Sequence, residues 1–244
     1  MTVSRYNGAA FLDAYRVELE ARQSICFATL ANMIRPVKGK YIVDLGCGPG
    51  NFSKQLEKLG AIVWGVDRSP EWIEYCKKSY RESATLKFVT ANGANLSFLR
   101  DEQVNIVVMN LVVPNVASYT ELSRIFAEVG RVLKPGGAFV FSDLHPALIV
   151  SPKVSPDRSN WYAPGFSYFR NGSEFVARIK LGKRPPIEFQ NKHWTLETYT
   201  RLLSRAGMTI FRIAEPTYGV HAPRKLRSYK IPEYIMFGCV KRNA

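Results

Sequence analysis

Three glycines closely follow an acidic residue in the stretch VDLGCGPG, residues 43–50. The apolar residues before the glycines predict a buried strand, and the apolar periodicity from Phe52 to Leu59 predicts a helix after them. A glycine turn between a strand and a helix lets a ligand approach the backbone closely, beside free N–H groups at the start of the helix. The stretch therefore predicts a nucleotide site.

The spacing of the glycines and the acid beside them narrow the choice of ligand. Dinucleotide-binding proteins use G-x-G-x-x-G and hold a pyrophosphate there, whereas this chain has Gly46, Gly48 and Gly50 with Asp44 close by. Two like charges ~4 Å apart repel by about 4 kcal/mol at an effective dielectric constant near 20. We therefore expect a positive charge on the ligand at this turn. Asp67, which ends the next apolar segment, can accept hydrogen bonds from both hydroxyls of a ribose.

A parallel sheet would bring these residues together, and the rest of the chain predicts one. Repeated strand–helix units imply a doubly wound α/β fold. After His145 the pattern changes, and residues 146–192 predict an insertion with a hairpin that turns at Asn171–Gly172. A helix over 195–207 and two strands then close the chain. Before the insertion, strands are expected over 41–46, 61–67, 86–90, 104–110 and 138–143, with helices over about 8–35, 52–59, 70–80 and 118–133.

Composition bounds the class of protein. The chain has 244 residues, of which 46% are hydrophobic, and this suits a single α/β domain with a sizeable core. Its four cysteines and three histidines lack the spacing of a disulfide framework or a metal site. No apolar stretch has the length of a membrane span. We expect a cytoplasmic protein with no metal and no membrane span.

Taken together, the motifs resemble the class I methyltransferases that use S-adenosylmethionine. VDLGCGPG, GVDRSPEW and RVLKPGGAFVFSD stand in the family's order, and the resemblance covers about residues 40–145. The segments HWTLETYTRLLSRAGMTIFRIAEP and IPEYIMFGCVKR resemble the C-terminal end of the subfamily that acts on small molecules. The resemblance implies a Rossmann-like fold with a seven-stranded, mostly parallel sheet in a single domain, 1–244. Its expected parts are an N-terminal helical lid (1–36), a cofactor-binding core (37–145), an inserted cap over the acceptor site (146–192) and a C-terminal helix with strands (193–244).

The same resemblance implies a set of cofactor contacts. S-adenosylmethionine carries an ammonium, a carboxylate and a sulfonium group, so Asp44 is expected to favour its cationic end, with the backbone of the glycine turn against the amino-acid part. Asn92 stands where the family places an acid for the adenine amino group, and the next two residues would offer backbone N–H groups. Tyr15 resembles a lid tyrosine or simply packs on its helix. The expected set is Tyr15, Asp44, Gly46, Cys47, Gly48, Gly50, Asp67, Arg68, Asn92, Gly93, Ala94, Asn110 and Leu111.

Methyl transfer is an in-line displacement, so the main task of the protein is to align and desolvate the acceptor. Where a base is needed, His145 at the end of the fifth strand and His193 at the start of a helix are the candidates, and a hydrogen-bonded structural role is the alternative for each. Cys47 is expected to be a small filler rather than a catalytic thiol. The aromatic residues of the insertion either line an acceptor pocket or form a small core of their own: Trp161, Tyr162, Phe166, Tyr168 and Phe169.

The expected acceptor is a small molecule, aromatic or anionic, methylated at oxygen, nitrogen or carbon, as in natural-product pathways. Nucleic acid is the first alternative, because residues 151–244 carry 17 Lys and Arg against 6 Asp and Glu, or +11 of the net charge of +14. However, NLVVPN replaces the N/D-P-P-Y/F type of motif that relatives acting on bases place after the fourth strand. A non-catalytic regulator that binds S-adenosylmethionine is the second alternative. The amphipathic N-terminal helices would suit a homo-oligomer.

Overall fold

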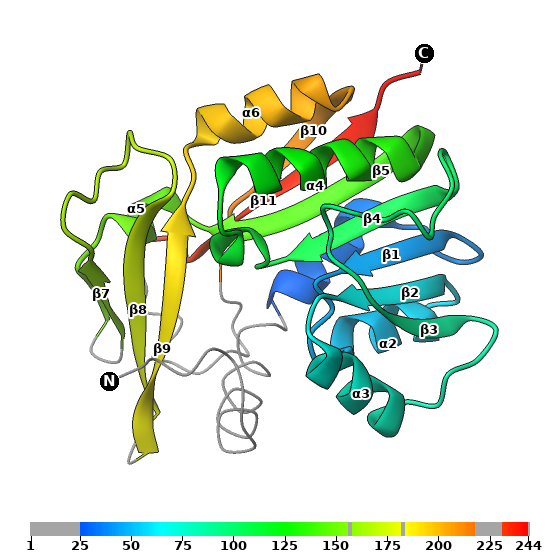
Figure 1. The fold of residues 1–244 in the computed structure, drawn as a ribbon, viewed down its shortest axis with the longest axis horizontal. Helices are drawn as coiled ribbons and strands as arrows, with labels where there is room; N and C mark the ends of the chain where they lie inside the picture. The colour runs from blue at the N-terminus through cyan, green and yellow to red at the C-terminus, as the bar shows by residue number, and fades with distance from the viewer. Residues whose placement is uncertain (1–24, 156–157, 182–183, 218–230, 244) are drawn as a thin grey trace.

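The computed structural model describes residues 25–155, 158–181, 184–217 and 231–243 (Figure 1). A seven-stranded sheet in the order β10-β11-β5-β4-β1-β2-β3 forms its centre. The strands β1 to β5 are parallel to one another, and β11 is antiparallel to both of its neighbours. The expected doubly wound α/β sheet is confirmed. Its strands are β1 (Tyr41–Leu45), β2 (Ile62–Asp67), β3 (Leu86–Thr90), β4 (Val104–Asn110), β5 (Leu133–Leu144), β10 (Met208–Ala214) and β11 (Tyr234–Lys241).

Helices cover both faces of the sheet and form a separate apolar core on each. Residues 25–34, α2 and α3 pack on one face, and α4 and α6 lie side by side on the other (Figure 1). The described helices are α2 (Asn51–Lys58), α3 (Pro70–Ser79), the 3-10 turn η1 (Val113–Asn115), α4 (Tyr119–Val132), α5 (Pro146–Ile149) and α6 (Leu196–Arg205).

Local sequence signals set where two of these helices begin. The Ser69 hydroxyl accepts a hydrogen bond from the Trp72 N–H at 3.2 Å at the start of α3. At the start of α4, the Ser118 hydroxyl accepts from the Glu121 N–H at 3.1 Å, while the Glu121 carboxylate reaches back to the Ala117 N–H at 2.8 Å. These two bonds form a capping box, except that the Glu121 carboxylate accepts from the residue before Ser118 and not from Ser118 itself. Both helix starts agree with the sequence expectation.

The insertion forms a second sheet of four antiparallel strands. Asn171 and Gly172 form a turn before β8 as expected, but the strand expected directly before them is absent, because residues 163–172 form a longer connection from β7, with which β8 pairs antiparallel. The Asn171 side-chain oxygen accepts hydrogen bonds from the Thr195 N–H at 3.0 Å and from the Thr198 hydroxyl at 2.9 Å, which tie this connection to the start of α6. The strands are β6 (Lys153–Ser155), β7 (Arg158–Tyr162), β8 (Ser173–Leu181) and β9 (Arg184–His193).

The expected N-terminal lid is described only from residue 25 onward. Residues 25–34 are helical and bury Cys26 and Leu30 against the sheet. Tyr15 lies outside the described residues. Within the described ranges, no helix is both long enough and apolar enough to cross a membrane. The same ranges contain no group of three or more His, Cys, Asp or Glu side chains that could hold a metal ion.

Candidate active site

A cavity of about 520 Å³ opens where β1, β2 and β4 end. This carboxyl edge of a parallel sheet is where open α/β proteins bind their ligands, and the volume suits a nucleoside-sized molecule. Eight of the expected cofactor residues line the cavity, and they are Gly46, Gly48, Asp67, Arg68, Asn92, Gly93, Asn110 and Leu111. The lining also includes Leu45, Val66, Ser69, Pro70, Glu71, Trp72, Ala91, Val112, Asn115, Val116, Glu121 and Ile125.

The glycine turn requires glycine for two different reasons. Gly46 and Gly48 both have positive φ values, +73° and +50°, which side chains of other residues rarely allow. A Cβ at Gly46 would lie 2.2 Å from Val112 Cγ2, so this glycine allows the turn to pack against the segment after β4. A Cβ at Gly48 would meet nothing within 4 Å and would project into open space. Because Gly48 lines the cavity, that space is available to a ligand.

The turn uses its N–H groups internally, which corrects the expectation that they are free. The N–H groups of Gly46 and Cys47 donate to the Val66 carbonyl at 2.7 and 3.0 Å, and the Gly48 N–H donates to Asp67 Oδ2 at 2.9 Å. These three N–H groups are therefore not available to a bound phosphate, whereas the carbonyl oxygens of the turn can accept from an ammonium group. The turn therefore suits a cationic ligand, as the acid beside the glycines predicted.

Asp67 is held in one orientation at the end of β2. Its Oδ2 accepts from the Gly48 N–H and its Oδ1 accepts from the Ser69 N–H, each at 2.9 Å. A carboxylate oxygen has two lone-pair directions, so each oxygen can still accept one more hydrogen bond. Two neighbouring hydroxyl groups of a ribose would supply such donors.

Asp44 lies behind the turn and does not line the cavity. Its side chain is 2% exposed, and Oδ2 accepts a hydrogen bond from the Ser53 hydroxyl at 2.6 Å. Burial raises the pKa of Asp44 to about 7, although the hydrogen bond from Ser53 opposes this shift. The structure thus places Asp44 as a support for the first turn of α2, and its influence on a bound cation stays a prediction.

Cys47 is buried within the turn. A hydrogen bond with Cys76, followed by burial, raises the pKa of the Cys47 thiol well above its usual value. A nucleophilic cysteine needs a lowered pKa. The surroundings of Cys47 are therefore those of a packing residue.

The cavity is acidic although the chain as a whole is basic. Its charged lining residues are Asp67, Glu71 and Glu121 against one guanidinium, that of Arg68. A hydrogen bond from the Ser69 hydroxyl lowers the pKa of Glu71, which favours its charged form. In a chain of net charge +14, this local excess of carboxylates favours a ligand with a positive charge.

Asn92 lines the cavity on the side where the sequence predicts the adenine. The exposed Asn92 side chain uses Oδ1 to accept from the Ala94 N–H at 2.9 Å. Ala94 does not line the cavity and its N–H is already bonded, so the expectation that it offers this N–H to a ligand is wrong. Gly93 does line the cavity.

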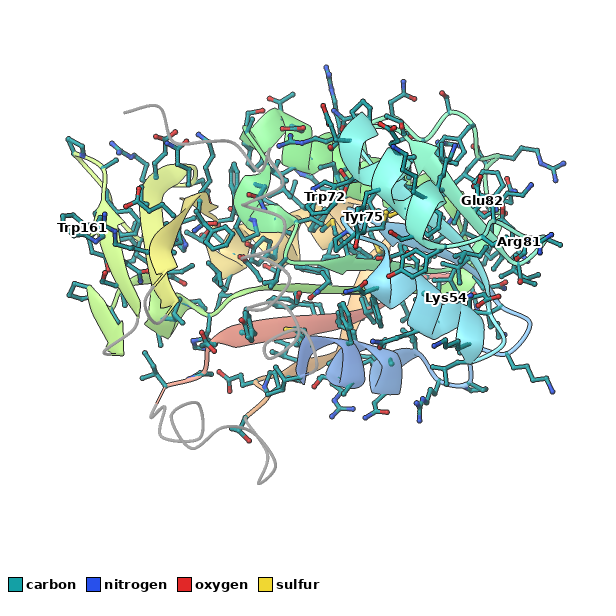
Figure 2. All side chains as sticks on the ribbon, turned by 90° about the horizontal axis from the view of Figure 1, so that it is seen from below. Lys54, Trp72, Tyr75, Arg81, Glu82 and Trp161 are labelled. Atoms are coloured by element: carbon teal, nitrogen blue, oxygen red, sulfur yellow. The ribbon has the colours of Figure 1, made fainter. Side chains whose placement is uncertain are left out.

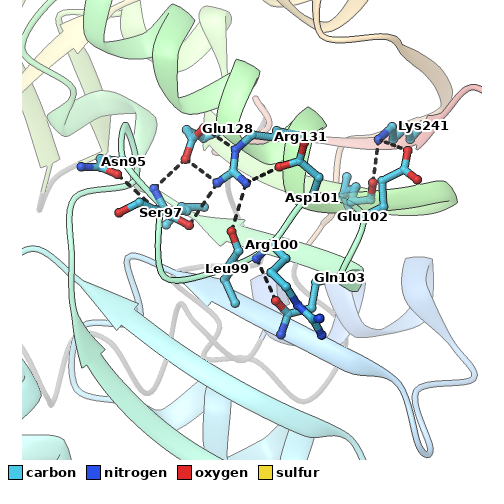
Figure 3. Close-up of polar contacts among 12 residues, drawn as sticks. Asn95, Ser97, Leu99, Arg100, Asp101, Glu102, Gln103, Glu128, Arg131 and Lys241 are labelled. Carbon is cyan, nitrogen blue, oxygen red and sulfur yellow. Dashed lines mark hydrogen bonds and ion pairs between the residues drawn. The ribbon is translucent and has the colours of Figure 1, made fainter.

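Arg131 on α4 fixes the loop that follows Asn92 and Gly93 (Figure 3). Its guanidinium donates to the Leu99 carbonyl at 3.0 Å and to Asp101 Oδ1 at 2.7 Å. Glu128, which also binds Arg131, accepts from the Leu96 N–H at 2.7 Å. These contacts lie outside the cavity lining and stabilise residues 96–101.

Neither of the two candidate bases lines the cavity. The two histidines differ in whether a ring nitrogen keeps a lone pair that a substrate could use. His145 Nδ1 accepts from the Ala147 N–H at 3.0 Å, so the hydrogen is on Nε2, which lies 2.6 Å from Glu215 Oε1. In this arrangement His145 caps α5 and keeps no lone pair for a substrate.

His193 is fully buried, and its Nε2 lies 2.8 Å from the Tyr168 carbonyl. A carbonyl can only accept, so Nε2 carries the hydrogen and Nδ1 keeps a lone pair, for which the described residues supply no partner. Burial lowers the pKa of His193. Of the two histidines, only His193 keeps a nitrogen that can accept a proton, and its role as a base stays a prediction.

The aromatic residues of the insertion divide into two groups. Trp161 and Phe169 are 60% and 89% exposed, and Figure 2 shows Trp161 at the end of the molecule away from Trp72 and α3. Phe166 instead packs with Tyr162 at 4.5 Å and with the buried Phe175 at 6.2 Å between ring centroids. The second group belongs to the apolar core that residues 25–34 and α2 also form, so the expected separate core of the insertion is wrong.

Sequence reasoning missed several residues of the cavity wall. Glu71 and Trp72 stand in the GVDRSPEW motif, where the proximity to Asp67 was an available signal. Figure 2 shows Trp72 and Tyr75 together on α3, with their rings at 5.9 Å and perpendicular. Glu121 was recognised only as a capping residue, because nothing local shows that the start of α4 reaches the cavity.

The fold and the site together define a nucleoside-binding α/β protein whose ligand is cationic. Residues 43–141 match the family model described as "Methyltransferase domain". A putative S-adenosylmethionine-dependent methyltransferase from Listeria monocytogenes shares the fold with a TM-score of 0.68 and 21% sequence identity, over 91% of this chain and 100% of that one. Residues 43–141 are therefore similar to a methyltransferase domain, and the chain shares its fold with that solved methyltransferase structure.

Two curated relatives each match about half of the chain. A thiol S-methyltransferase of Homo sapiens is 32% identical over 137 residues, which is 54% of this chain and 54% of that protein. The phthiotriol/phenolphthiotriol dimycocerosates methyltransferase of Mycobacterium tuberculosis is 36% identical over 110 residues, 44% of this chain and 39% of that protein. The chain thus spans about half or less of the length of these relatives.

Proposed function

We propose that this protein transfers a methyl group from S-adenosylmethionine to an oxygen, nitrogen or carbon atom of a small molecule. The observation that carries the proposal is the polarity of the cavity. The glycine turn there has no free N–H at Gly46, Cys47 or Gly48, and three carboxylates line the wall against one guanidinium. Such a site favours a nucleoside that carries a positive charge over one that carries a pyrophosphate.

The residues present fit the parts of this cofactor. Asp67 can still accept from the two ribose hydroxyls, and the space in front of Gly48 would be filled by a Cβ. The carbonyl oxygens of the turn suit the ammonium group of the amino-acid tail. When bound, S-adenosylmethionine supplies an electrophilic methyl group on a sulfonium centre. The chain binds and orients it, and aligns the acceptor for an in-line approach.

His193 would take a proton from an acceptor that needs to lose one. Its unprotonated Nδ1 keeps the lone pair that this step requires, and because this atom is buried outside the cavity lining, the step requires an acceptor site that extends to His193 in the insertion. His145 would need to exchange its bond with the Ala147 N–H before it could do the same. For an acceptor that is already a good nucleophile, alignment alone is sufficient.

The acceptor is proposed to be a small aromatic or anionic molecule. One relative is named for a thiol acceptor and the other for phthiotriol compounds, and these acceptors are small molecules. A reducing, cytoplasmic location is supported by the four cysteines, all of which are buried free thiols. A homo-oligomer remains part of the proposal, and light scattering of the purified chain would measure it.

Isothermal titration calorimetry and a transfer assay test this function. We expect the chain to bind S-adenosylmethionine and S-adenosylhomocysteine but not NAD⁺, because NAD⁺ places a pyrophosphate at the glycine turn. Incubation with S-adenosylmethionine labelled in the methyl group, and with an aromatic amine, a phenol or tRNA, should label one of the two small molecules. Binding of NAD⁺ alone would refute the cofactor, label on tRNA alone would favour nucleic acid, and tight binding with no transfer would favour a regulator.

A further inference from the structure

The end of β4 has a strained backbone at the cavity. Leu111 has a φ of +54°, a left-handed conformation that is costly for a residue with a large side chain. Such strain persists only where surrounding contacts enforce it. Asn115 Nδ2 donates to the Leu111 carbonyl at 3.2 Å, and the Ser142 hydroxyl on the neighbouring strand β5 accepts from the Leu111 N–H at 2.9 Å.

The same hydroxyl fixes the amide of Asn110. The Ser142 hydroxyl is fully buried and lies opposite Asn110 in the pairing of β4 with β5. It accepts from Leu111, so its single hydrogen is free to donate, and it donates to Asn110 Oδ1 at 2.6 Å. A flipped amide would place N–H groups toward Ser142 and leave that hydrogen without this acceptor. The two bonds to Ser142 therefore select one orientation of the amide.

This orientation leaves the Asn110 Nδ2 group for the cavity. Asn110 lines the cavity, and no described residue accepts a hydrogen bond from Nδ2. The strand β4 neighbours β1, and Val112 beyond it packs against Gly46. Asn110 therefore ends beside the glycine turn, on the side where the amino-acid tail of the cofactor would lie.

A carboxylate on that tail needs donors, and the turn supplies none from the N–H groups of Gly46, Cys47 and Gly48. Building on the proposed function, we propose that Ser142 is a positioning residue, which turns the Asn110 amide so that Nδ2 donates to the carboxylate of the bound cofactor. A neutral amide gives this carboxylate a donor without adding a positive charge beside the ammonium and sulfonium groups. Neither Ser142 nor this polarity of Asn110 is visible from the local sequence.

Calorimetry with two probes tests the assignment in the full chain. S-adenosylhomocysteine carries the amino-acid tail, whereas 5′-methylthioadenosine has the same nucleoside and sulfur without that tail. Replacing Ser142→Ala should raise the Kd for S-adenosylhomocysteine roughly tenfold or more, as expected for a lost hydrogen bond to a charged group. The Kd for 5′-methylthioadenosine should change little. An equal loss for both probes, or no loss for either, would overturn the proposal.

A double-mutant cycle separates positioning from a general effect on packing. Asn110→Ala should weaken the binding of S-adenosylhomocysteine by a factor similar to that of Ser142→Ala. The double variant should bind this ligand about as weakly as Asn110→Ala alone. Additive losses would contradict the coupling. Ser142→Thr keeps the hydroxyl and should restore affinity. Ser173→Ala is the matched control, because Ser173 is also buried and also makes two hydrogen bonds, but in the insertion.

Two further measurements keep the test decisive. Thermal melting shows whether Ser142→Ala folds. If Ser142→Ala does not fold, Asn110→Asp replaces it in the test. A carboxylate that faces the cavity should weaken the binding of S-adenosylhomocysteine more than Asn110→Ala does, and the binding of 5′-methylthioadenosine should not change. The proposed function has its own readout in the unmodified protein. If that protein binds neither probe, the proposed cofactor fails, whereas normal binding without these differences refutes only the role of Ser142.

Discussion

Replacing Asp67 by asparagine tests the ribose assignment most directly. The carboxylate accepts two backbone hydrogen bonds at 2.9 Å, one on each oxygen, and keeps one lone pair on each for a hydroxyl. Asparagine has one oxygen, so its NH2 group faces a backbone N–H on one side and cannot accept from a hydroxyl there. Each hydrogen bond to a charged group contributes about 1.5–3 kcal/mol. We expect Asp67→Asn to weaken cofactor binding roughly ten- to hundredfold.

Calorimetry with a pair of nucleosides isolates the contact from the shape of the turn. Adenosine carries both ribose hydroxyls, and 2′,3′-dideoxyadenosine carries neither. The wild-type protein should bind adenosine more tightly, and Asp67→Asn should lose much of that preference. A general distortion of the glycine turn would instead weaken both nucleosides equally.

A matched control uses the same chemical change elsewhere. Asp101→Asn removes a carboxylate that is 75% exposed and binds Arg131 away from the cavity. It should keep the wild-type preference for adenosine. If Asp67→Asn also keeps the full wild-type ratio between the two nucleosides, Asp67 does not bind the ribose and the reasoning from its geometry is refuted.

Three other predictions concern the turn, the buried acid and the candidate base. Gly46→Ala should destabilise the fold and lower the melting temperature, because its Cβ would overlap a methyl group of Val112. Gly48→Ala should fold but bind the cofactor with a higher Kd. A Gly48→Ala protein with full cofactor affinity would contradict this prediction. The Asp44 carboxyl has a pKa of about 7 when folded and 3.8 as a free side chain, so folding takes up a proton between these values and the free energy of unfolding should fall as pH rises through that window. Asp44→Asn should reduce this fall in urea unfolding at pH 5 and pH 8, and an identical fall in both proteins would exclude it. His193→Ala should lower kcat more than it lowers cofactor affinity. The kcat of the wild-type protein should decrease when the pH falls below the lowered pKa of His193. Equal single-turnover rates in the wild-type and His193→Ala proteins would show that alignment alone drives the transfer.

Local sequence was sufficient for the order of the strands and helices of the main sheet along the chain, and it predicted eight residues that line the cavity. The alternation of apolar segments with capped helices reflects contacts within a few residues, so Ser69 and Ser118 signal where helices begin. The glycines at 46 and 48 report a backbone conformation that only glycine adopts easily. Asp67 follows from its place at the end of a strand. Each of these features is encoded close to where it acts.

The tertiary structure decided which polar groups remain available to a ligand. The N–H groups of the glycine turn are taken by Val66 and Asp67, and the lone pair of His145 is taken by Ala147, whereas His193 keeps one. The contact of the Asn171 side chain with Thr195 and Thr198 at the start of α6 has the same origin, because it joins residues that are distant in the sequence.

Ser142 and Asn110 show the limit of the sequence most clearly. They are 32 residues apart, and only the pairing of β4 with β5 brings the hydroxyl against the amide. A pattern of residue types predicts which groups can donate or accept, since that is a property of each side chain. Which of them are already bonded depends on neighbours from distant strands, and those neighbours are set by packing of the whole sheet.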